Sequence, residues 1–170
     1  WSRRTADSFS FLLAACCTYA NGQLLINEIA PNNSGYYDDE DNTFPDWIEL
    51  VNTGATTLNV GGYAITDDMD TWNQWLLGNY NIPAGGRLRI FASAKNRDCF
   101  TCGGVVSEMH TNFKLSYGET LALYDDAGNL LDSLTIPTLQ AGHTMARIPD
   151  GGAWCYSGTP TPNATNTGTC

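Results

Sequence analysis

The sequence contains no lysine or arginine between Arg4 and Arg87, and the whole chain has only 8 basic residues against 18 acidic ones. The resulting formal charge of −10 repels phosphate backbones, and no run of basic residues offsets it. Nucleic-acid binding driven by counterion release is therefore not expected. The sequence also lacks an apolar run near the ~20 residues that a membrane-spanning helix needs. It has no sustained helical periodicity, which argues against a coiled coil or a helical bundle.

The residues that are present favour a single all-β domain. A chain of 170 residues is long enough for one domain with a substantial core. A hydrophobic content of 42% excludes a disordered chain, and 17 glycines and 7 prolines among closely spaced turn signals favour many short strands. An acidic surface is typical of a secreted protein or of a cation binder.

Residues 1–23 have the layout of an export signal or N-terminal extension, because two arginines precede an apolar stretch at 9–15 and then small residues. Two cleavage sites compete. Residues 13–16 resemble a bacterial lipobox, which would make Cys16 the lipidated first residue, whereas residues 18–20 resemble an ordinary signal-peptidase site. Cleavage at the second site leaves an even number of cysteines, which favours it. In a third alternative the segment stays attached and packs as a strand.

Alternating apolar residues predict a central strand at 46–51. The alternation directs Ile48 and Leu50 to one face and Trp47 and Glu49 to the other. Both faces carry large apolar groups, so this strand should lie inside the protein. Further strands are predicted at 24–30, 58–65, 87–92, 120–124 and 130–134.

The spacing of these segments predicts a β-sandwich of about eight short strands over residues 24–158. Paired glycines at 61–62, inside a strand pattern, indicate a bulge or a close backbone approach. Residues 95–112 resemble an insertion, with two cysteines and little apolar periodicity. Residues 159–170 are rich in threonine, proline and asparagine, which predicts a tail or linker with a frayed end.

A succession of motifs along the chain resembles the bacterial branch of the lamin-tail domain family. The motifs are Ile-Asn-Glu-Ile at 26–29, Asp-Trp-Ile-Glu-Leu at 46–50, Asn-Thr-Gly at 52–54, Gly-Tyr at 62–63, Thr-Asp-Asp at 66–68, Pro-Ala-Gly-Gly at 83–86, Phe-Ala-Ser at 91–93, Thr-Asn-Phe-Lys-Leu-Ser at 111–116, and Pro-Asp-Gly at 149–151 followed by Trp154. The resemblance covers about residues 24–166. It implies an immunoglobulin-like β-sandwich that, in bacterial relatives, is attached to exported or surface proteins. It offers no catalytic residues to carry over, and the insertion around Cys99 and Cys102 departs from the family pattern.

Two acidic loops, one before the central strand and one after the strand at 58–65, are the best candidates for a metal site. Carboxylates without basic neighbours repel one another, and coordination of Ca²⁺ by several oxygen ligands would relieve that repulsion. If both loops open at the same end of the sandwich, they could share one calcium site; the alternative is two solvated loops. The proposed ligands are Asp38, Asp39, Asp41, Asp67, Asp68 and Asp70.

The cysteines in the second half of the chain predict disulfides. The spacing of Cys99 and Cys102 fits a short disulfide, or half of a redox or zinc motif for which His110 is the nearby additional ligand. An oxidising compartment favours the disulfide. A bond between Cys155 and Cys170 would fasten the tail, and loop entropy gives it ~3 kcal/mol against ~2 kcal/mol for the short ring. Pairing across the two sets stays open, because spacing does not determine connectivity.

Aromatic side chains near the acidic loops suggest a surface that contacts sugars or peptides. Tyr37, Trp72 and Trp75 are the candidates, and the alternative is that the two tryptophans cap the sandwich core. His110 and His143 belong to no recognisable nucleophile or metal motif, so no enzymatic use is expected.

These features together predict a non-catalytic extracellular or cell-surface module for binding or attachment. Its expected partner is an extracellular protein, a glycan or a second copy of the chain. Alternative functions are a structural subunit of a surface assembly or filament, and a cation-dependent accessory domain of a secreted hydrolase. No cofactor other than Ca²⁺ is expected. Membrane contact is expected only through a lipid on Cys16, which would make the chain an outer-membrane lipoprotein.

Overall fold

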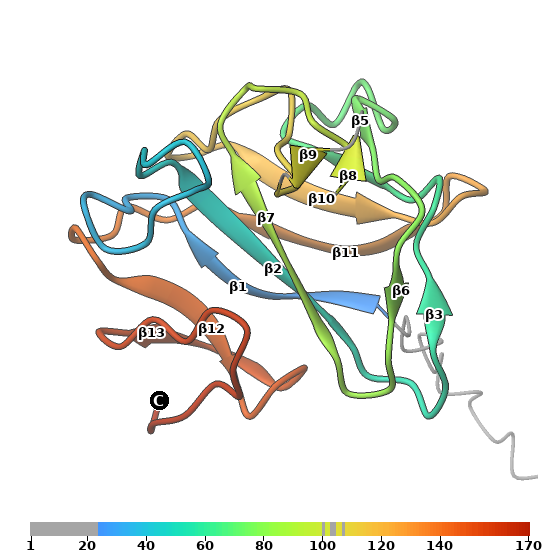
Figure 1. Cartoon of the computed structure of the whole chain (residues 1–170). Helices are drawn as coiled ribbons and strands as arrows, with labels where there is room; N and C mark the ends of the chain where they lie inside the picture. Colours follow the sequence, from blue (N-terminus) through green and yellow to red (C-terminus); the bar gives the residue numbers. More distant parts are fainter. Residues whose placement is uncertain (1–23, 100, 103–104, 107) are drawn as a thin grey trace, which may run out of the picture.

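The computed structural model describes residues 24–99, 101–102, 105–106 and 108–170, with side chains for all of these except 101–102 and 105–106. The described residues form a two-layer β-sandwich, as the sequence predicted (Figure 1). No helix long and apolar enough to cross a membrane occurs among them. The predicted export signal and the lipidation of Cys16 lie outside the described residues.

One layer is a five-stranded antiparallel sheet with the order β13-β12-β1-β2-β7. Its strands are β1 (Leu24–Ala30), β2 (Asp46–Asn52), β7 (Arg87–Ala92), β12 (Thr144–Ile148) and β13 (Ala153–Ser157). The predicted central strand is β2, which pairs with β1 on one side and β7 on the other. Its position inside the sheet is therefore confirmed.

The other layer is a four-stranded sheet with the order β11-β10-β4-β5. Its strands are β4 (Ala64–Thr66), β5 (Trp75–Leu76), β10 (Thr120–Tyr124) and β11 (Leu130–Thr135). The core between the layers confirms the predicted alternation, because Ile48 and Leu50 lie in it together with Leu88 and Ile90 of β7. On the opposite face of the five-stranded sheet, Trp47 packs in a separate apolar cluster.

The predicted strand at 58–65 is two strands in two different sheets. β3 (Leu58–Asn59) pairs with β6 (Asn81–Ile82), whereas β4 pairs with β10 and β5. Gly62, between β3 and β4, has φ +85°, a left-handed conformation that glycine adopts with little strain. The prediction of one strand over 58–65 is therefore wrong, because the glycines turn the chain from one sheet to the next. The alternative of a close approach agrees with Gly61, where an added Cβ atom would overlap Asn79 Oδ1.

The predicted insertion is anchored to the edge of the five-stranded sheet. Its tip is a hairpin of β8 (Thr101–Cys102) and β9 (Val105–Val106). The returning chain pairs with β7, since Phe91 N donates to Met109 O at 2.9 Å and Thr111 N donates to Phe91 O at 2.8 Å. This pairing fixes His110 close to the end of β7.

An ion pair between the layers closes one side of the sandwich. Arg147 on β12 donates to both carboxylate oxygens of Asp132 on β11, at 2.9 and 3.0 Å. Arg147 Nε also donates to Ile26 O at 2.9 Å, and Ile26 N donates to Asp132 Oδ2 at 3.0 Å. The pair therefore satisfies the backbone groups of β1 at the point where β12 no longer covers them.

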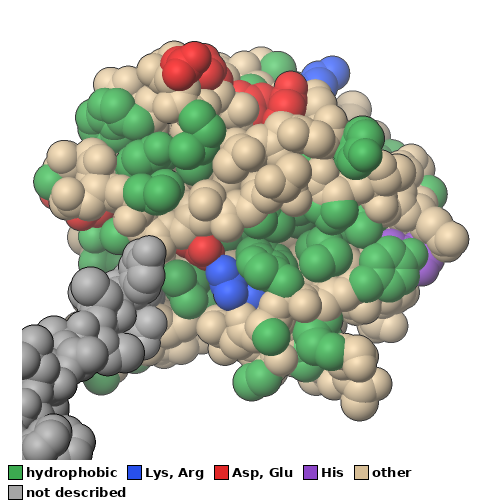
Figure 2. Space-filling model, turned by 180° about the vertical axis from the view of Figure 1, so that it is seen from behind, with side chains coloured by type: hydrophobic (Ala, Val, Ile, Leu, Met, Phe, Trp, Pro, Cys, Tyr) green, Lys and Arg blue, Asp and Glu red, His purple; other side chains and the backbone are tan. Residues whose placement is uncertain are grey.

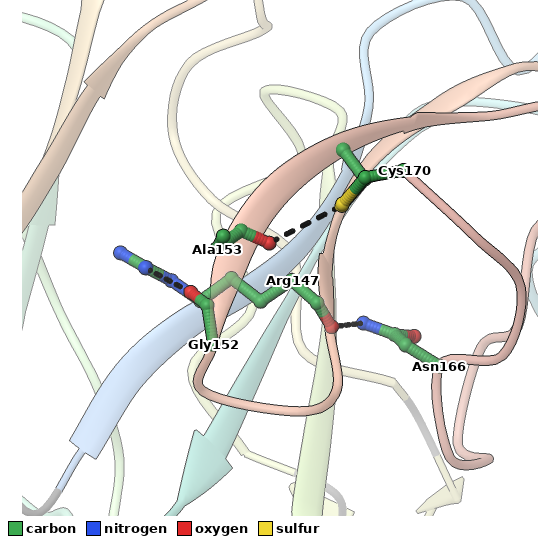
Figure 3. The surroundings of a disulfide bond; sticks show 6 residues. Arg147, Gly152, Ala153, Asn166 and Cys170 are labelled. Atoms are coloured by element: carbon green, nitrogen blue, oxygen red, sulfur yellow. Dashed lines mark hydrogen bonds between the residues drawn. A yellow bond between two sulfur atoms is a disulfide. The ribbon is translucent and has the colours of Figure 1, made fainter.

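The C-terminal residues pack on the five-stranded sheet, although their composition predicted a tail or linker with a frayed end. Asn166 is buried, and its amide donates to Asn27 O and Arg147 O, both at 3.1 Å. The predicted disulfide between Cys155 on β13 and Cys170 is present (Figure 3). Polar side chains of the tail therefore find buried partners, which the composition by itself does not reveal.

Candidate functional site

The acidic loop before β2 is neutralised by basic residues from the insertion. Lys95 Nζ binds the carboxylates of Asp39 and Asp41, and Arg97 binds those of Glu40 and Asp41. The premise that these carboxylates lack counter-charges is therefore wrong. The sequence hides the arrangement because more than fifty residues separate the partners.

Asp39 is a structural residue of this loop. Its buried carboxylate accepts hydrogen bonds from Asp41 N at 3.0 Å, Thr43 N at 2.9 Å and Thr43 Oγ1 at 2.8 Å. Burial by itself would raise the pKa of Asp39, but the bonds from Lys95 and Thr43 outweigh it and hold the pKa below its usual value. The carboxylate is thus ionised and fully occupied within the protein.

Beside this loop, three side chains form a hydrogen-bonded chain that the sequence did not reveal. The buried ring of His110 lies 2.9 Å from Glu40 Oε2 through Nε2 and 2.8 Å from Ser93 Oγ through Nδ1. If Glu40 accepts the proton of Nε2, Nδ1 is free to accept from the hydroxyl of Ser93. The chain joins the end of β7, the insertion and the acidic loop.

The second acidic loop, after β4, is organised differently. Asp68 Oδ1 accepts from Asp70 N at 3.0 Å, and Asp68 Oδ2 accepts from Thr71 Oγ1 at 3.0 Å. Within the described part of the chain, no Lys, Arg or His forms an ion pair with Asp67, Asp68 or Asp70. Hydrogen bonds within its own turn therefore hold this loop, and among the described residues no ion pair neutralises the charge of its carboxylates.

The structure does not bring the six predicted calcium ligands together. Among the described residues, the one group of three potential ligands with atoms within 4.8 Å of one another is Asp39, Glu40 and His110. Glu40 and His110 are not among the six predicted calcium ligands, and no member comes from the loop after β4. Ca²⁺ binding, whether shared between the two loops or at either loop by itself, stays a prediction.

The three predicted aromatic residues lie in three different environments. Trp75 is buried in the main core, as the alternative interpretation expected. Tyr37 packs edge-on against Trp47, with ring centroids 6.1 Å apart, on the outer face of the five-stranded sheet. Trp72 remains 37% exposed and lies against Tyr124, with ring centroids 6.0 Å apart. Of these three residues, Trp72 is thus the most exposed to a partner.

Trp72 extends an apolar row across the outer face of the four-stranded sheet, which we call the Trp72 face. Leu76 pairs with Ala64, Ala64 with Tyr124, and Tyr124 with Leu130 across β5, β4, β10 and β11. Ala64 and Tyr124 cluster apart from the main core, while Leu76 and Leu130 are 47% and 51% exposed. The face consists of Trp72, Leu76, Tyr124 and Leu130.

The tail of the chain covers a pair of buried carboxylates that the sequence analysis did not single out as a site. Glu28 on β1 and Glu49 on β2 are directly paired across the strands, and both are fully buried. Thr161 N and Oγ1 donate to Glu28, and Asn163 N donates to Glu49 Oε2 at 2.6 Å. The sequence does contain a signal for this pair, because Glu28 and Glu49 each interrupt an apolar strand pattern.

Burial controls the ionisation of this pair. Desolvation raises the pKa of Glu49 to about 7, against the opposing effect of the bond from Asn27. The pKa of Glu28 is also raised by burial, which the hydroxyl of Thr144 opposes. Arg87 Nε lies 3.8 Å from Glu49 Oε1. The pair is therefore a pH-sensitive element beneath the tail.

Two surface depressions are lined by described residues. One of about 500 Å³ contains Asp150, which already binds Arg87 and Asn27. Another of about 440 Å³ is lined by Phe44, Asp46, Ser93, Lys95 and Lys114. Both have volumes typical of small-ligand sites.

Cys99 also takes part in a disulfide. Its pairing with Cys102 stays a prediction, because the side chain of Cys102 lies outside the described residues. Oxidation of Cys99, Cys155 and Cys170 agrees with the disulfides expected from the sequence. These cysteines are therefore structural in the protein as described.

The two-sheet antiparallel sandwich places the chain among immunoglobulin-like modules. Residues 18–138 match the Lamin Tail Domain family, so the chain belongs to this family, as its motifs indicated. Lamin tail domains are generally non-catalytic binding or structural modules. A comparison with curated proteins gives no match. The family match ends before β12, β13 and the tail, although these segments pack on the matched strands.

Proposed function

We propose that the chain is a non-catalytic binding or attachment module that works at the cell surface or in a secreted protein. The observation that carries this proposal is the disulfide between Cys155 and Cys170, in a chain whose residues 18–138 match the lamin tail domain. Structural disulfides persist in oxidising compartments and are rare in the cytosol. The disulfide fastens the segment that covers Glu28 and Glu49, so it contributes to the packing of the domain.

The chain from Ser93 to His110 and Glu40 is the strongest feature in favour of a hydrolase. Its surroundings support a positioning role instead. Glu40 is also bound by Arg97, and the hydroxyl of Ser93 accepts from Lys95 N at 3.2 Å. These bonds attach the acidic loop to the insertion, and they leave the serine committed to a local turn.

The proposal is tested with the purified full-length chain. We expect saturable binding in a screen against displayed peptides and immobilised glycans, and no turnover of ester, glycosidic or peptide substrates with or without Ca²⁺. Thiol titration of the unfolded, unreduced chain should find none of Cys99, Cys155 and Cys170 free. Turnover that depends on Ser93, or the absence of any binding partner, would contradict the proposal.

A further inference from the structure

The Trp72 face combines exposed apolar groups with acidic residues on both sides. Figure 2, which views the molecule from behind, shows hydrophobic side chains gathered at the upper left with acidic side chains above them. The loop that carries Trp72 also carries Asp67, Asp68 and Asp70. The turn between β10 and β11 carries Asp125 and Asp126.

The turn between β10 and β11 lies directly against Trp72. A Cβ atom on Gly128 would lie 3.4 Å from the indole, an ordinary contact distance, so the backbone of this turn packs beside the ring. Across β10, the indole packs on Tyr124. Both acidic segments are thus next to one aromatic group that is partly exposed.

The carboxylates around this face have no basic partner among the described residues. The ion pairs of the structure include none of the five aspartates of these two segments. In the loop before β2, by contrast, each of the residues 39–41 has a basic partner. Uncompensated carboxylates beside an apolar surface attract a ligand that supplies both cations and apolar groups.

We propose that the Trp72 face is a docking surface for a basic segment of a partner protein in which lysine or arginine residues flank a large apolar residue. The apolar residue packs against Trp72, Leu76 and Leu130, and the basic side chains reach Asp70 and Asp126. An arginine or lysine over the indole adds a cation–π contact. This inference rests on the proposed binding function and assigns it a surface and a partner chemistry.

Charge complementarity selects this occupant over the other candidates. Nucleic acids and anionic membranes would be repelled by the aspartates. A second copy of the chain offers little basic surface, because Arg87, Arg89, Lys95, Arg97 and Arg147 are all engaged in ion pairs. Only Lys114 of the described basic residues lies outside the ion pairs.

The test starts with selection of a random-peptide display library on the full-length chain. We expect the selected peptides to be enriched in lysine and arginine beside tryptophan, phenylalanine or leucine. Affinity of a selected peptide should fall about tenfold or more in Trp72→Ala, as is usual for a central aromatic contact. Leu130→Lys should have a similar effect without removing a packed ring, and thermal melting will show that both variants are folded.

The charge contribution is measured with matched pairs of substitutions. Asp70→Asn with Asp126→Asn should weaken the same peptide about threefold to tenfold and reduce its sensitivity to NaCl. Asp38→Asn with Asp98→Asn removes the same charge at two other exposed positions and should change the affinity little. Tyr117→Ala, at a residue that is 74% exposed elsewhere, is the aromatic control.

Two results would overturn the inference while leaving the binding module intact. One is a selected peptide whose affinity is unchanged by Trp72→Ala and Leu130→Lys. The other is a dimer in sedimentation experiments that Leu130→Lys dissociates, which would make the face a contact between copies. Failure to recover any ligand from peptide and glycan screens would count against both the inference and the proposed function.

Discussion

The acidic loop before β2 and the acidic loop after β4 have similar composition but different electrostatic environments. In the first, Lys95 and Arg97 arrive from the insertion and bind three carboxylates. In the second, Asp68 accepts hydrogen bonds from its own turn, and no described basic residue forms an ion pair with the loop. Local sequence therefore does not determine whether an acidic loop is a structural element or a surface with unmatched charge.

The two loops are also expected to have different roles, one in the stability of the domain and the other in binding. Carboxylates that are bound by buried or half-buried cations hold the loop in place and have little capacity left for a ligand. Carboxylates without such partners contribute little to folding but retain their attraction for external cations. The first loop is therefore expected to affect the stability of the domain, and the second is expected to affect its binding.

The largest expected effect concerns Glu28 and Glu49, which are buried away from solvent. Among the described residues, their one ion pair joins Glu49 to Arg87 at 3.8 Å. A pKa near 7 in the folded chain, against 4.5 in the unfolded chain, means that the folded state binds more protons between these values. Stability should then fall as pH rises from about 4.5 to 7, by on the order of 3 kcal/mol. Urea unfolding at several pH values measures this slope.

The variant Glu49→Gln isolates the contribution of this group. The substitution changes the hydrogen bonds from Asn27 and Asn163, so the free energy of unfolding can shift at every pH. Between pH 4.5 and about 7, however, the free energy of unfolding should depend less steeply on pH than in the unmodified chain. Glu119→Gln, at an exposed position, is the control, and an unchanged slope in Glu49→Gln would refute the assignment.

The next effect concerns Lys95. The variant Lys95→Met leaves the buried carboxylate of Asp39 without its cation, and we expect a loss of about 2 kcal/mol at pH 7. The pKa of Asp39 is lowered in the folded state, so this stabilisation is present above the unfolded value of 3.8 and disappears as pH falls through the folded value. Chemical denaturation of both proteins at pH 7 and at pH 3 measures how much stability Lys95 contributes at each pH.

Lys114→Met is the matched control for Lys95, because Lys114 lies outside the ion pairs of the described residues. It should change the free energy of unfolding by no more than about 0.5 kcal/mol. Equal losses in the two lysine variants would mean that the ion pairs of the first loop do not stabilise the fold.

A smaller effect is expected from Ca²⁺, if it binds the loop after β4. At a fivefold excess over Kd, binding to the folded state adds about 1 kcal/mol, which corresponds to a rise in Tm of roughly 2–4 °C. Mg²⁺ should have less effect, because it gives up its water ligands reluctantly. Melting curves in Ca²⁺, Mg²⁺ and chelator test this, and a shift that persists in Asp68→Asn with Asp70→Asn would exclude this loop.

The smallest effect on stability is expected from Asp70→Asn combined with Asp126→Asn. These exposed carboxylates have no ion pair in the described structure, so their loss should change the free energy of unfolding by less than about 0.5 kcal/mol. Thermal melting at low and moderate salt provides the measurement. A large destabilisation would show that the second loop is as structural as the first, and the contrast between the loops would disappear.

The sequence by itself determined the strands whose apolar alternation continues over several residues. β1, β2, β7, β10 and β11 lie where they were predicted, and the faces of β2 are as predicted. The motifs also identified the family, and the cysteines of an exported chain predicted the disulfide between Cys155 and Cys170 that the structure contains. These features depend on short-range periodicity or on residue identity, which a sequence displays directly.

Only the tertiary structure decided which charges meet. Lys95 and Arg97 lie more than fifty residues from the acids that they bind, and the tail reaches Glu28 and Glu49 across more than a hundred. The same holds for Leu76, Tyr124 and Leu130, which become one surface only when their strands pair. Side-chain contacts of this kind depend on strand order and on burial, and neither quantity is a property of any local stretch of residues.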